Sequence, residues 1–464
     1  MELFLHDSQQ GSKRTFEPID AQRITMYVCG PTVYNYVHIG NGRPAVVFDT
    51  LYRLLQKLYP EVVYARNITD VDDKINQAAA ENGEPIAVLS ARFADAYEAD
   101  LRGLNVLPPA IAPRATEHIP QIIAMIEKLI ANGYAYEAEG HALFHVPADE
   151  QYGELSRRSL DDMLAGARVD VAPYKRDPKD YVLWKPSTDD LPGWDSPWGR
   201  GRPGWHIECS AMIESHLGER IDIHGGGSDL LFPHHENEAA QSRCALGHER
   251  TVNYWLHNGM LTLGSEKMSK SVGNVLVLHH MLEQYSGDLL RYALLAAHYR
   301  ASLAWGEDLL TQAGKALDTF YQALRTVPAL ANASAANEAD RPLDTLPEDF
   351  VQALLDDLNT PQAMAQLHAL ARSINVTSDD AEREALGRDL LACGWHLGIL
   401  NTAVERYFQG TDDGDEATIQ AQVDERLAAK AARDFNRADA IREQLLKDGI
   451  ELEDTREGTR WRRL

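Results

Sequence analysis

The sequence predicts an α/β domain with a parallel sheet, followed by an α-helical bundle and a small C-terminal module. Strand-like Ile24 to Cys29 and Val62 to Arg66 flank a segment in which apolar residues recur at helical spacing. This strand–helix–strand order is typical of a βαβ unit. Beyond Asp288 the apolar pattern is helical, and residues 423–464 form a compact, charged unit. These observations set the order of the domains.

The elements follow one another along the chain. After the first βαβ unit, Ile119 to Ile130 carries the apolar spacing of an amphipathic helix that ends at Asn132-Gly133. A stretch rich in Pro, Trp and Tyr follows, with a short strand near Leu143 to Val146, and we interpret it as an insertion. Strand-like Ile221 to His224 then resumes the sheet. Residues 409–422 are acidic and lack a period, which predicts a linker.

Composition restricts the class of protein. The chain has 464 residues, of which 44% are apolar and 25% charged, the balance of a folded globular protein. The sequence has no apolar run of the roughly 18 residues that a membrane-spanning helix needs. Met1 to Lys13 lacks the apolar core of a signal peptide, so we expect a cytoplasmic protein with no membrane partner. The net charge of −25 argues against nonspecific nucleic-acid binding but leaves room for a local basic patch.

Two short motifs, far apart in the chain, have the chemistry of a nucleotide site. The first, His38-Ile39-Gly40-Asn41, follows a predicted strand and precedes a predicted helix, whose free N–H groups suit a phosphate. The second, Lys267-Met268-Ser269-Lys270-Ser271, carries two cations that can stabilise a polyphosphate transition state. Taken singly, the motifs are more often an ordinary turn and a solvated basic loop. Their joint presence favours the nucleotide site.

A glycine run follows the strand that resumes the sheet. In His224-Gly225-Gly226-Gly227-Ser228-Asp229, a glycine such as Gly226 would let an adenosine lie against the backbone. Asp229 would accept hydrogen bonds from ribose hydroxyls. A plain loop is the simpler interpretation of the run alone.

The sequence also contains a candidate metal site. Cys29 and Cys209 are thiols, and His234 and Glu238 are four residues apart, so they share one face if that stretch is helical. Two thiolates, an imidazole and a carboxylate suit tetrahedral zinc. By spacing alone His235 could replace His234. A solvated helix face and isolated buried thiols are the simpler interpretations of these residues.

The remaining cysteines and the C-terminal end complete the candidates. Cys244 and Cys393 match no ligand position, which predicts that they lie in the core. Arginines cluster around Trp461 at Arg456, Arg460, Arg462 and Arg463. Arginine pairs with phosphate and an aromatic ring can stack on an unpaired base, although a solvated tail is the simpler reading.

Longer motifs carry a resemblance to a known family. The two signature motifs resemble those of the class I aminoacyl-tRNA synthetases. Five further segments resemble the cysteinyl-tRNA synthetases among them: Val28–Tyr34 (VCGPTVY), Arg66–Lys74 (RNITDVDDK), Gly204–Ser210 (GWHIECS), Phe232–Glu238 (FPHHENE) and Trp255–Gly259 (WLHNG). The resemblance runs in order over nearly the whole chain. One departure is Asn41, which stands where the first signature has a second histidine and cannot carry a proton charge.

This resemblance implies a Rossmann-like class I catalytic domain with an insertion. It implies the following divisions: catalytic halves at 1–114 and 201–255, a connective insertion at 115–200, a signature-loop and stem-contact region at 256–308, a helical bundle at 309–408, and an anticodon-binding module at 423–464. The implied reaction joins L-cysteine to its tRNA with ATP, through a cysteinyl-adenylate. Magnesium would accompany the ATP, and the enzyme would be a monomer.

The resemblance also implies roles for individual residues. It implies Cys29, Cys209, His234 and Glu238 as ligands of one zinc ion per chain, and Trp205 and His224 at the substrate pocket. The implied catalytic residues are His38, Lys267 and Lys270, and ATP would contact His38, Gly40, Asn41, Gly226, Asp229 and Lys270. Arg460, Trp461 and Arg462 would bind tRNA.

Two other functions fit parts of the sequence. A related ligase of thiol biosynthesis joins cysteine to an amino sugar with the same pocket and signatures, but it would not need an anticodon module. A non-catalytic synthetase-like protein would bind tRNA or amino acid for regulation, and loss of signature lysines or metal ligands would support that function. All of these residues are present here. Pyrophosphate exchange with cysteine and ATP separates a catalytic from a non-catalytic protein, and charging of tRNA separates the two enzymes.

Overall fold

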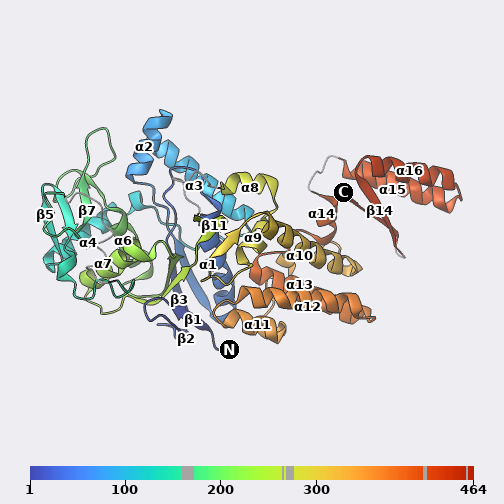
Figure 1. Cartoon of the computed structure of the whole chain (residues 1–464), viewed down its shortest axis with the longest axis horizontal. Coiled ribbons are helices and arrows are strands. Elements are labelled where there is room, and N and C mark those ends of the chain that lie inside the picture. Colours follow the sequence, from blue (N-terminus) through green and yellow to red (C-terminus); the bar gives the residue numbers. More distant parts are fainter. Residues whose placement is uncertain (159–171, 264–265, 268–275, 411–414, 456–457, 464) are drawn as a thin grey trace. The chain divides into compact units, whose positions relative to one another are not determined.

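The computed structural model describes residues 1–158, 172–263, 266–267, 276–410, 415–455 and 458–463 (Figure 1). The chain divides into two compact units. The first comprises Met1–Gly314, Pro342–Ala365 and His396–Gly398, and the second comprises Lys315–Arg341, Gln366–Trp395 and Ile399–Leu464. Among the described residues, no helix is both long and apolar enough to cross a membrane.

The centre of the first unit is a parallel sheet. Its described strands are β3 (Arg23–Val28), β4 (Glu61–Arg66), β9 (Ile221–Gly227) and β10 (Val252–Asn258), in the order β10-β9-β3-β4. All neighbouring pairs are parallel, with Tyr27 opposite both Ala65 and His224. The carboxyl ends of the four strands therefore lie at one edge, where open α/β sheets bind their ligands.

Helix α1 (Ile39–Leu58) connects β3 to β4 and completes the predicted βαβ unit. The apolar face that the spacing predicts is buried at Val47, Leu51, Leu54 and Leu55. This packing places the first turn of α1 at the carboxyl edge of the sheet. Two further helices, α2 (Asp73–Asn82) and α3 (Ile86–Gly103), follow β4.

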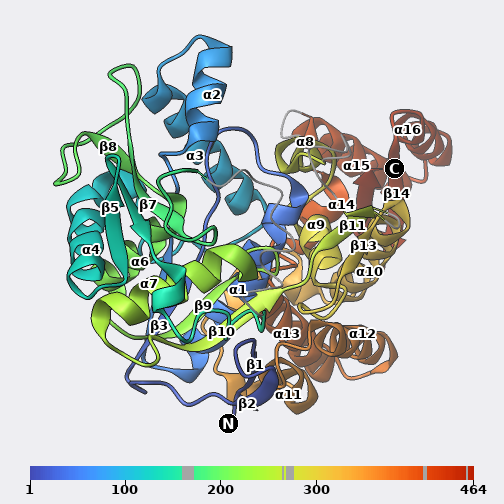
Figure 2. The ribbon, with the colours of Figure 1, turned by 60° about the vertical axis from the view of Figure 1, so that its left-hand side comes forward.

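The stretch predicted as an insertion, 115–200, contributes three strands of an antiparallel sheet, which also includes a strand and packs against helices from beyond residue 200 (Figure 2). The strands of this sheet pair in the order β5 (Ala135–Ala138), β6 (His141–Phe144), β7 (Tyr181–Pro186) and β8 (Gly201–Pro203). The helices are α4 (Ile119–Ala131), α6 (Trp205–Leu217) and α7 (Glu236–Leu246), with short turns η1 (Ala115–Glu117), η2 (Val146–Ala148) and η3 (Leu231–His235). Their shared core includes Ile126, Trp184, Ile207 and Ala240.

Smaller elements complete the first unit. An N-terminal hairpin pairs β1 (Phe4–Asp7) with β2 (Ser12–Thr15). After β10, a small sheet has the order β12 (Glu266–Lys267), β11 (Leu261–Leu263), β13 (Leu303–Trp305). Helices α8 (Leu278–Gln284), α9 (Gly287–Leu295) and α11 (Glu348–Leu355) and the turn η7 (Leu343–Thr345) also belong here.

The predicted helical region is present. Its long helices, which run across the unit boundaries, are α10 (Glu307–Arg325), α12 (Thr360–Val376) and α13 (Asp380–Leu397). The second unit also holds η5 (Pro328–Leu330), η6 (Ala335–Glu338) and α14 (Val404–Gln409). Its C-terminal part consists of α15 (Glu416–Ala431), α16 (Phe435–Lys447) and a hairpin of β14 (Ile450–Thr455) and β15 (Gly458–Arg463).

One boundary differs from the sequence prediction. Helix α15 begins at Glu416, so the second half of the predicted linker over 409–422 is helical. Ile419 and Val423 are buried in the core of the C-terminal part, which explains why this acidic, small-residue stretch folds as a helix. Within 409–422 the one buried apolar residue of this helix is Ile419, so the stretch itself shows no apolar period.

Candidate active site

A cavity of about 410 Å³ opens at the carboxyl edge of the parallel sheet. Its walls come from the turn after β3, the first turn of α1, and the ends of β9 and β10. Six of the residues singled out from the sequence line it: Cys29, His38, Gly40, Asn41, Trp205 and Asp229. The fold therefore brings the first signature motif and one proposed metal ligand to a single cavity.

The first signature motif forms the start of α1. His38 is the residue that precedes the helix, and its backbone N–H donates a hydrogen bond to the side-chain oxygen of Asn41 at 3.3 Å. Asn41 thus stabilises the helix start with a neutral group. A Cβ atom on Gly40 would lie 2.8 Å from Cε1 and Nδ1 of His38, so the His38 ring occupies space that only glycine leaves open.

The glycine run after β9 differs from its prediction. A Cβ atom on Gly226 would lie 2.8 Å from Cε1 of His235, and one on Gly225 would lie 2.2 Å from Cε1 of Phe48. These glycines admit neighbouring side chains, and Gly226 is not among the residues that line the cavity. Gly227 and Asp229 do line it. The prediction that Gly226 lies against the nucleotide is therefore not supported by the cavity.

The four predicted metal ligands meet beside the cavity. Sγ of Cys29 lies 3.8 Å from Sγ of Cys209 and 3.4 Å from Oε1 of Glu238. Nε2 of His234 lies 3.7 Å from Sγ of Cys209 and 2.9 Å from Oε1 of Glu238. Cys209, His234 and Glu238 are each 1% exposed, so the histidine-rich stretch packs inward and is not a solvated helix face.

These separations fit one tetrahedral metal ion. Zinc bonds of about 2.3 Å to sulfur and about 2.1 Å to nitrogen or oxygen would place neighbouring ligand atoms roughly 3.4–3.8 Å apart. The two sulfur atoms meet this value, and so does the Cys209–His234 pair. Nε2 of His234 and Oε1 of Glu238 are closer than two ligands of one ion, at 2.9 Å, which is a hydrogen-bonding distance. The donor set is therefore compatible with zinc.

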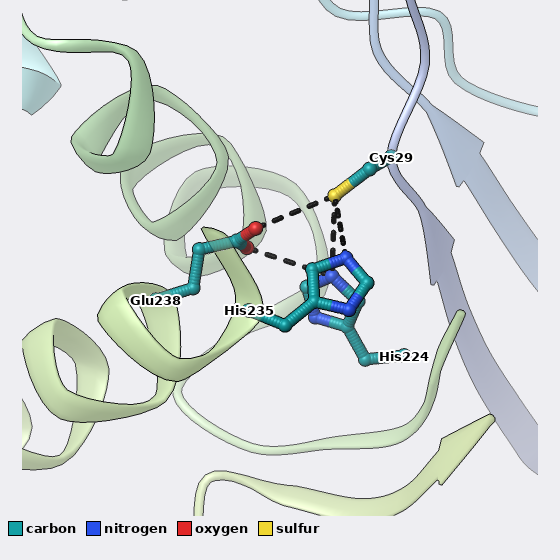
Figure 3. Close-up of side chains that lie close together, drawn as sticks. All are labelled: Cys29, His224, His235 and Glu238. Carbon is teal, nitrogen blue, oxygen red and sulfur yellow. Dashed lines mark hydrogen bonds and ion pairs between the residues drawn. The ribbon is translucent and has the colours of Figure 1, made fainter. Parts of the chain in front are cut away.

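A second group of four possible ligands overlaps the first and is shown in Figure 3. Nε2 of His224 and Nε2 of His235 point at Sγ of Cys29, at 3.4 and 3.3 Å, and Glu238 faces the same sulfur. The sequence spacing did not decide between His234 and His235 as the ligand, and the structure places both at the site. His224 is completely buried and does not itself line the cavity, but it belongs to a ligand group with Cys29, which does; its place at the substrate pocket stays a prediction.

His234 and His235 each have a hydrogen-bonding partner at Nδ1, the ring nitrogen that does not face the cysteines. Nδ1 of His234 lies 2.8 Å from Nδ1 of His206, and Nδ1 of His235 lies 2.7 Å from Nε2 of His257. Nδ1 of His257 lies in turn 2.8 Å from Oγ of Ser8. Such contacts fix the orientation of a metal-binding imidazole. His206 and His257 were not among the predicted site residues, although they lie inside two of the motifs that carry the resemblance.

Burial and mutual contact set the charge states of this cluster. The hydrogen bond with Cys29 lowers the pKa of Cys209 to about 7, whereas burial raises the pKa of Cys29 well above its usual value. Burial also lowers the pKa of His224 and His235 well below the usual value for histidine. Both rings are therefore neutral and offer lone pairs, the form that binds metal ions.

With this geometry established, comparison with known proteins identifies the family. A family model for the tRNA synthetases class I (C) catalytic domain matches residues 15–315, and one for the DALR domain matches residues 349–401. A cysteine–tRNA ligase of Xanthomonas campestris pv. campestris is 56% identical over 464 residues, covering 100% of this chain and 99% of that protein. One of Maricaulis maris is 53% identical over 466 residues, with 100% and 99% covered.

The chain belongs to the cysteine–tRNA ligase family. The predicted enzyme class, an aminoacyl-tRNA synthetase, is thereby confirmed. Solved structures agree with the fold. Methionyl-tRNA synthetase of Mycobacterium tuberculosis has a TM-score of 0.58 at 16% identity, covering 81% of this chain and 89% of its own. A putative arginyl-tRNA synthetase of Campylobacter jejuni has a TM-score of 0.53 at 14% identity, with 84% and 95% covered. The predicted class I catalytic domain with a following helical region is confirmed.

Other parts of this synthetase bear on the sequence predictions. Two cations that the sequence reasoning did not single out, Arg66 and Lys74, line the cavity from a motif that carries the resemblance. Lys267 lies in β12, and Lys270 lies outside the described residues. Cys244 and Cys393 are buried in the core, as predicted.

The structure contradicts the prediction that the Trp461 ring contacts tRNA. Its side chain is 2% exposed and belongs to the core of the C-terminal part, with Val423, Leu445 and Leu452. A ring so enclosed cannot stack on a base. Arg460 and Arg462, on either side of it in β15, are partly exposed and face acidic groups: Arg460 lies 3.6 Å from Glu405, and Nε of Arg462 lies 2.7 Å from Glu451.

Proposed function

We propose that this enzyme joins L-cysteine to its tRNA in two steps at the cavity, through a cysteinyl-adenylate, and that zinc selects the substrate thiol. The observation that supports this most is the position of Cys29. It lines the cavity and also belongs to the buried ligand cluster, so a small thiol in the cavity lies next to the metal-binding groups. The cavity of about 410 Å³ is large enough for an amino acid joined to a nucleotide.

The ligand cluster supports a mechanism for distinguishing cysteine from serine. The two amino acids differ only by sulfur in place of oxygen, and a hydrophobic pocket rejects such near-isosteres poorly. We propose that Cys29, Cys209, His234 and Glu238 hold the ion, with His224 and His235 beside it. A zinc ion held by these residues binds a thiolate far better than a hydroxyl and lowers the pKa of the thiol. Discrimination of about 10⁴–10⁵, a level at which editing is unnecessary, then becomes attainable at binding.

The remaining groups of the cavity orient the amino acid. Trp205 lines the cavity and its ring stacks on that of His234, with centroids 4.2 Å apart and planes inclined by 23°. We propose that Trp205 covers one side of the bound cysteine. His234 would then be fixed from two directions, by Trp205 on its face and by His206 at Nδ1.

Adenylate formation requires charge stabilisation more than covalent catalysis. The cysteine carboxylate attacks the α-phosphate of ATP in line, and the bond to pyrophosphate breaks. We propose that His38 and Asn41 hold the phosphates at the start of α1, that Gly40 leaves room for the His38 ring, and that Asp229 binds the ribose. Lys267 and Lys270 are proposed to neutralise the charge that develops on the leaving group. Mg²⁺ accompanies ATP as part of the substrate.

The second step transfers cysteine to tRNA. A terminal ribose hydroxyl of the tRNA attacks the carbonyl carbon of the mixed anhydride, and AMP leaves. We propose that the C-terminal part, α15 to β15, holds the anticodon through Arg460 and Arg462, with Trp461 maintaining the module. Phe435, at the start of α16, is 62% exposed and is an aromatic ring positioned to stack on a base. The domain divisions given above remain part of this proposal.

Two assays test the proposed function directly. Cysteine-dependent exchange of pyrophosphate into ATP reports adenylate formation, and esterification of tRNA with labelled cysteine reports the second step. We expect both with wild-type protein. Exchange without charging would favour the amino-sugar ligase, and the absence of both would favour a non-catalytic protein. The cytoplasmic location stays a prediction, and it agrees with a site whose thiols must remain reduced. The monomeric state also stays a prediction.

A further inference from the structure

The turn that leads into α1 is tied to the segment that precedes α8. The backbone N–H of Ile39 donates a hydrogen bond to the carbonyl oxygen of Leu276 at 2.9 Å, and the N–H of Leu278 donates to the carbonyl oxygen of Val37 at 2.9 Å. Residues 276–278 therefore pair with residues 37–39, and His38 lies at the centre of this pairing, opposite Val277. The backbone at His38 is therefore held by the segment 276–278.

Side chains extend this backbone pairing. Tyr36, which lines the cavity, stacks on His279 of α8 with ring centroids 4.6 Å apart and planes inclined by 17°. Phe93 of α3 packs its ring edge against Tyr36, with centroids 5.3 Å apart and an interplanar angle of 82°. Tyr36 is thus enclosed between α3 and α8, two residues before His38.

An acidic side chain fixes His279 in turn. Nδ1 of His279 lies 2.8 Å from Oδ1 of Asp100, and the Asp100 side chain is 4% exposed. The His279 ring is held at its edge by a buried carboxyl group and on its face by Tyr36. Its neighbour His280 is exposed and lies farther from Tyr36, at 6.1 Å between centroids with planes inclined by 47°.

We propose that His279 is a positioning residue for adenylate formation: held by Asp100, it fixes the ring of Tyr36 and thereby the turn that carries His38. The proposal rests on the proposed function of the cavity. Effective catalysis requires groups held close to the productive geometry, and a displacement of about 1 Å can lower a rate about 10²-fold. A contact that orders the 36–39 turn therefore acts on the chemical step without touching the substrate.

The test compares single-turnover rates of adenylate formation. We expect His279→Ala and Tyr36→Leu each to slow this step about tenfold, with little change in the KM for cysteine, whose thiol site is separate. The double variant should be no slower than either single variant, because both break the same contact. His280→Ala is the matched control and should match wild type.

Conservative variants separate positioning from general stability. His279→Phe keeps the stacked ring and His279→Asn keeps a donor near Asp100, so each should recover part of the rate. Thermal unfolding of the His279 variants should stay near wild type, because the His279 side chain is 38% exposed.

Two results would overturn the proposal: a wild-type rate in His279→Ala, or an equal loss in His280→Ala. Failure of the proposed function looks different, since wild-type protein itself would then form no adenylate with cysteine.

Discussion

The sulfur atoms of Cys29 and Cys209 lie 3.8 Å apart, although the residues are 180 positions apart in the sequence. Cys29 follows the central strand β3, and Cys209 lies in the first turns of α6, which packs on the antiparallel sheet of the insertion. The turn after the parallel strand β3 and helix α6, which packs on the antiparallel sheet, thus each contribute one thiol. Metal binding at this point would join the two substructures and stabilise the fold as well as the site.

Replacing one of these thiols should remove the metal. Cys209→Ser exchanges a soft thiolate for a hydroxyl, and we expect metal content to fall from about one ion per chain to near zero, with cysteine-dependent pyrophosphate exchange lost in parallel. Cys244→Ser, at a buried thiol of α7 in the core shared with the antiparallel sheet, is the matched control and should retain the metal. Elemental analysis of the purified proteins gives the result. Full metal content in Cys209→Ser would remove this residue from the ligand set.

Gly40→Ala should impair the chemical step. The new Cβ would lie 2.8 Å from the His38 ring, so the ring must move away from its place at the helix start. We expect adenylate formation to slow by about 10–10²-fold, as for misplaced catalytic groups. Gly314→Ala, also at a helical glycine, is the control, because its Cβ would meet only Cδ1 of Leu289 at 3.7 Å. Stopped-flow kinetics with wild-type rates for Gly40→Ala would show that His38 need not occupy this position.

Two aromatic substitutions should separate folding from RNA binding in the C-terminal part. Trp461→Ala removes a buried ring and should destabilise this part by about 3–5 kcal/mol. Phe435→Ala removes an exposed ring and should weaken tRNA binding by roughly 1–3 kcal/mol without changing unfolding. Urea unfolding and tRNA binding at fixed salt measure the two effects. Unchanged tRNA affinity in Phe435→Ala would place base stacking elsewhere.

The stability of the first unit should depend on a buried carboxylate. Burial would raise the pKa of Asp49, but the charges of Arg291 and Arg53 outweigh it and lower the pKa below its usual value. Its stabilising contribution is therefore present above the unfolded pKa of about 3.9 and is lost as the pH falls through the lower folded pKa.

The matched variant is Asp49→Asn. It leaves Arg291 buried without its carboxylate and should cost about 3–5 kcal/mol at pH 7. Urea unfolding from pH 7 downward should show a constant difference from wild type until about pH 4, below which the difference shrinks. A difference that shrinks already between pH 7 and 5 would contradict this account.

The βαβ unit could be predicted because its signal is local, whereas the full ligand set of two distant thiols, His234 and Glu238 came from the family resemblance. Strand–helix–strand periodicity located β3, α1 and β4, and four-residue spacing located His234 and Glu238 on one face. The supporting contacts of His206 and His257 could not be predicted, since they join residues whose separation follows no period. The same holds for Tyr36 and His279, which meet only after the chain has folded.

The error at Trp461 had a usable signal. Arg460, Trp461 and Arg462 alternate with the period of a strand, which directs Trp461 to the opposite face from the arginines. The prediction that all three residues contact tRNA did not use this alternation. The glycine at position 226 gave no such signal, because the side chain that fills its space, His235, comes from a different element.

The most direct test of the central claim is cysteine binding by protein from which the metal has been removed. Affinities for L-cysteine and L-serine should be measured by calorimetry on metal-loaded protein, on metal-free protein verified by elemental analysis, and after zinc is restored. We expect strong preference for cysteine with the metal, loss of most of that preference without it, and recovery on adding zinc. Undiminished preference for cysteine in verified metal-free protein would contradict the claim that a metal ion at Cys29, Cys209, His234 and Glu238 selects the substrate.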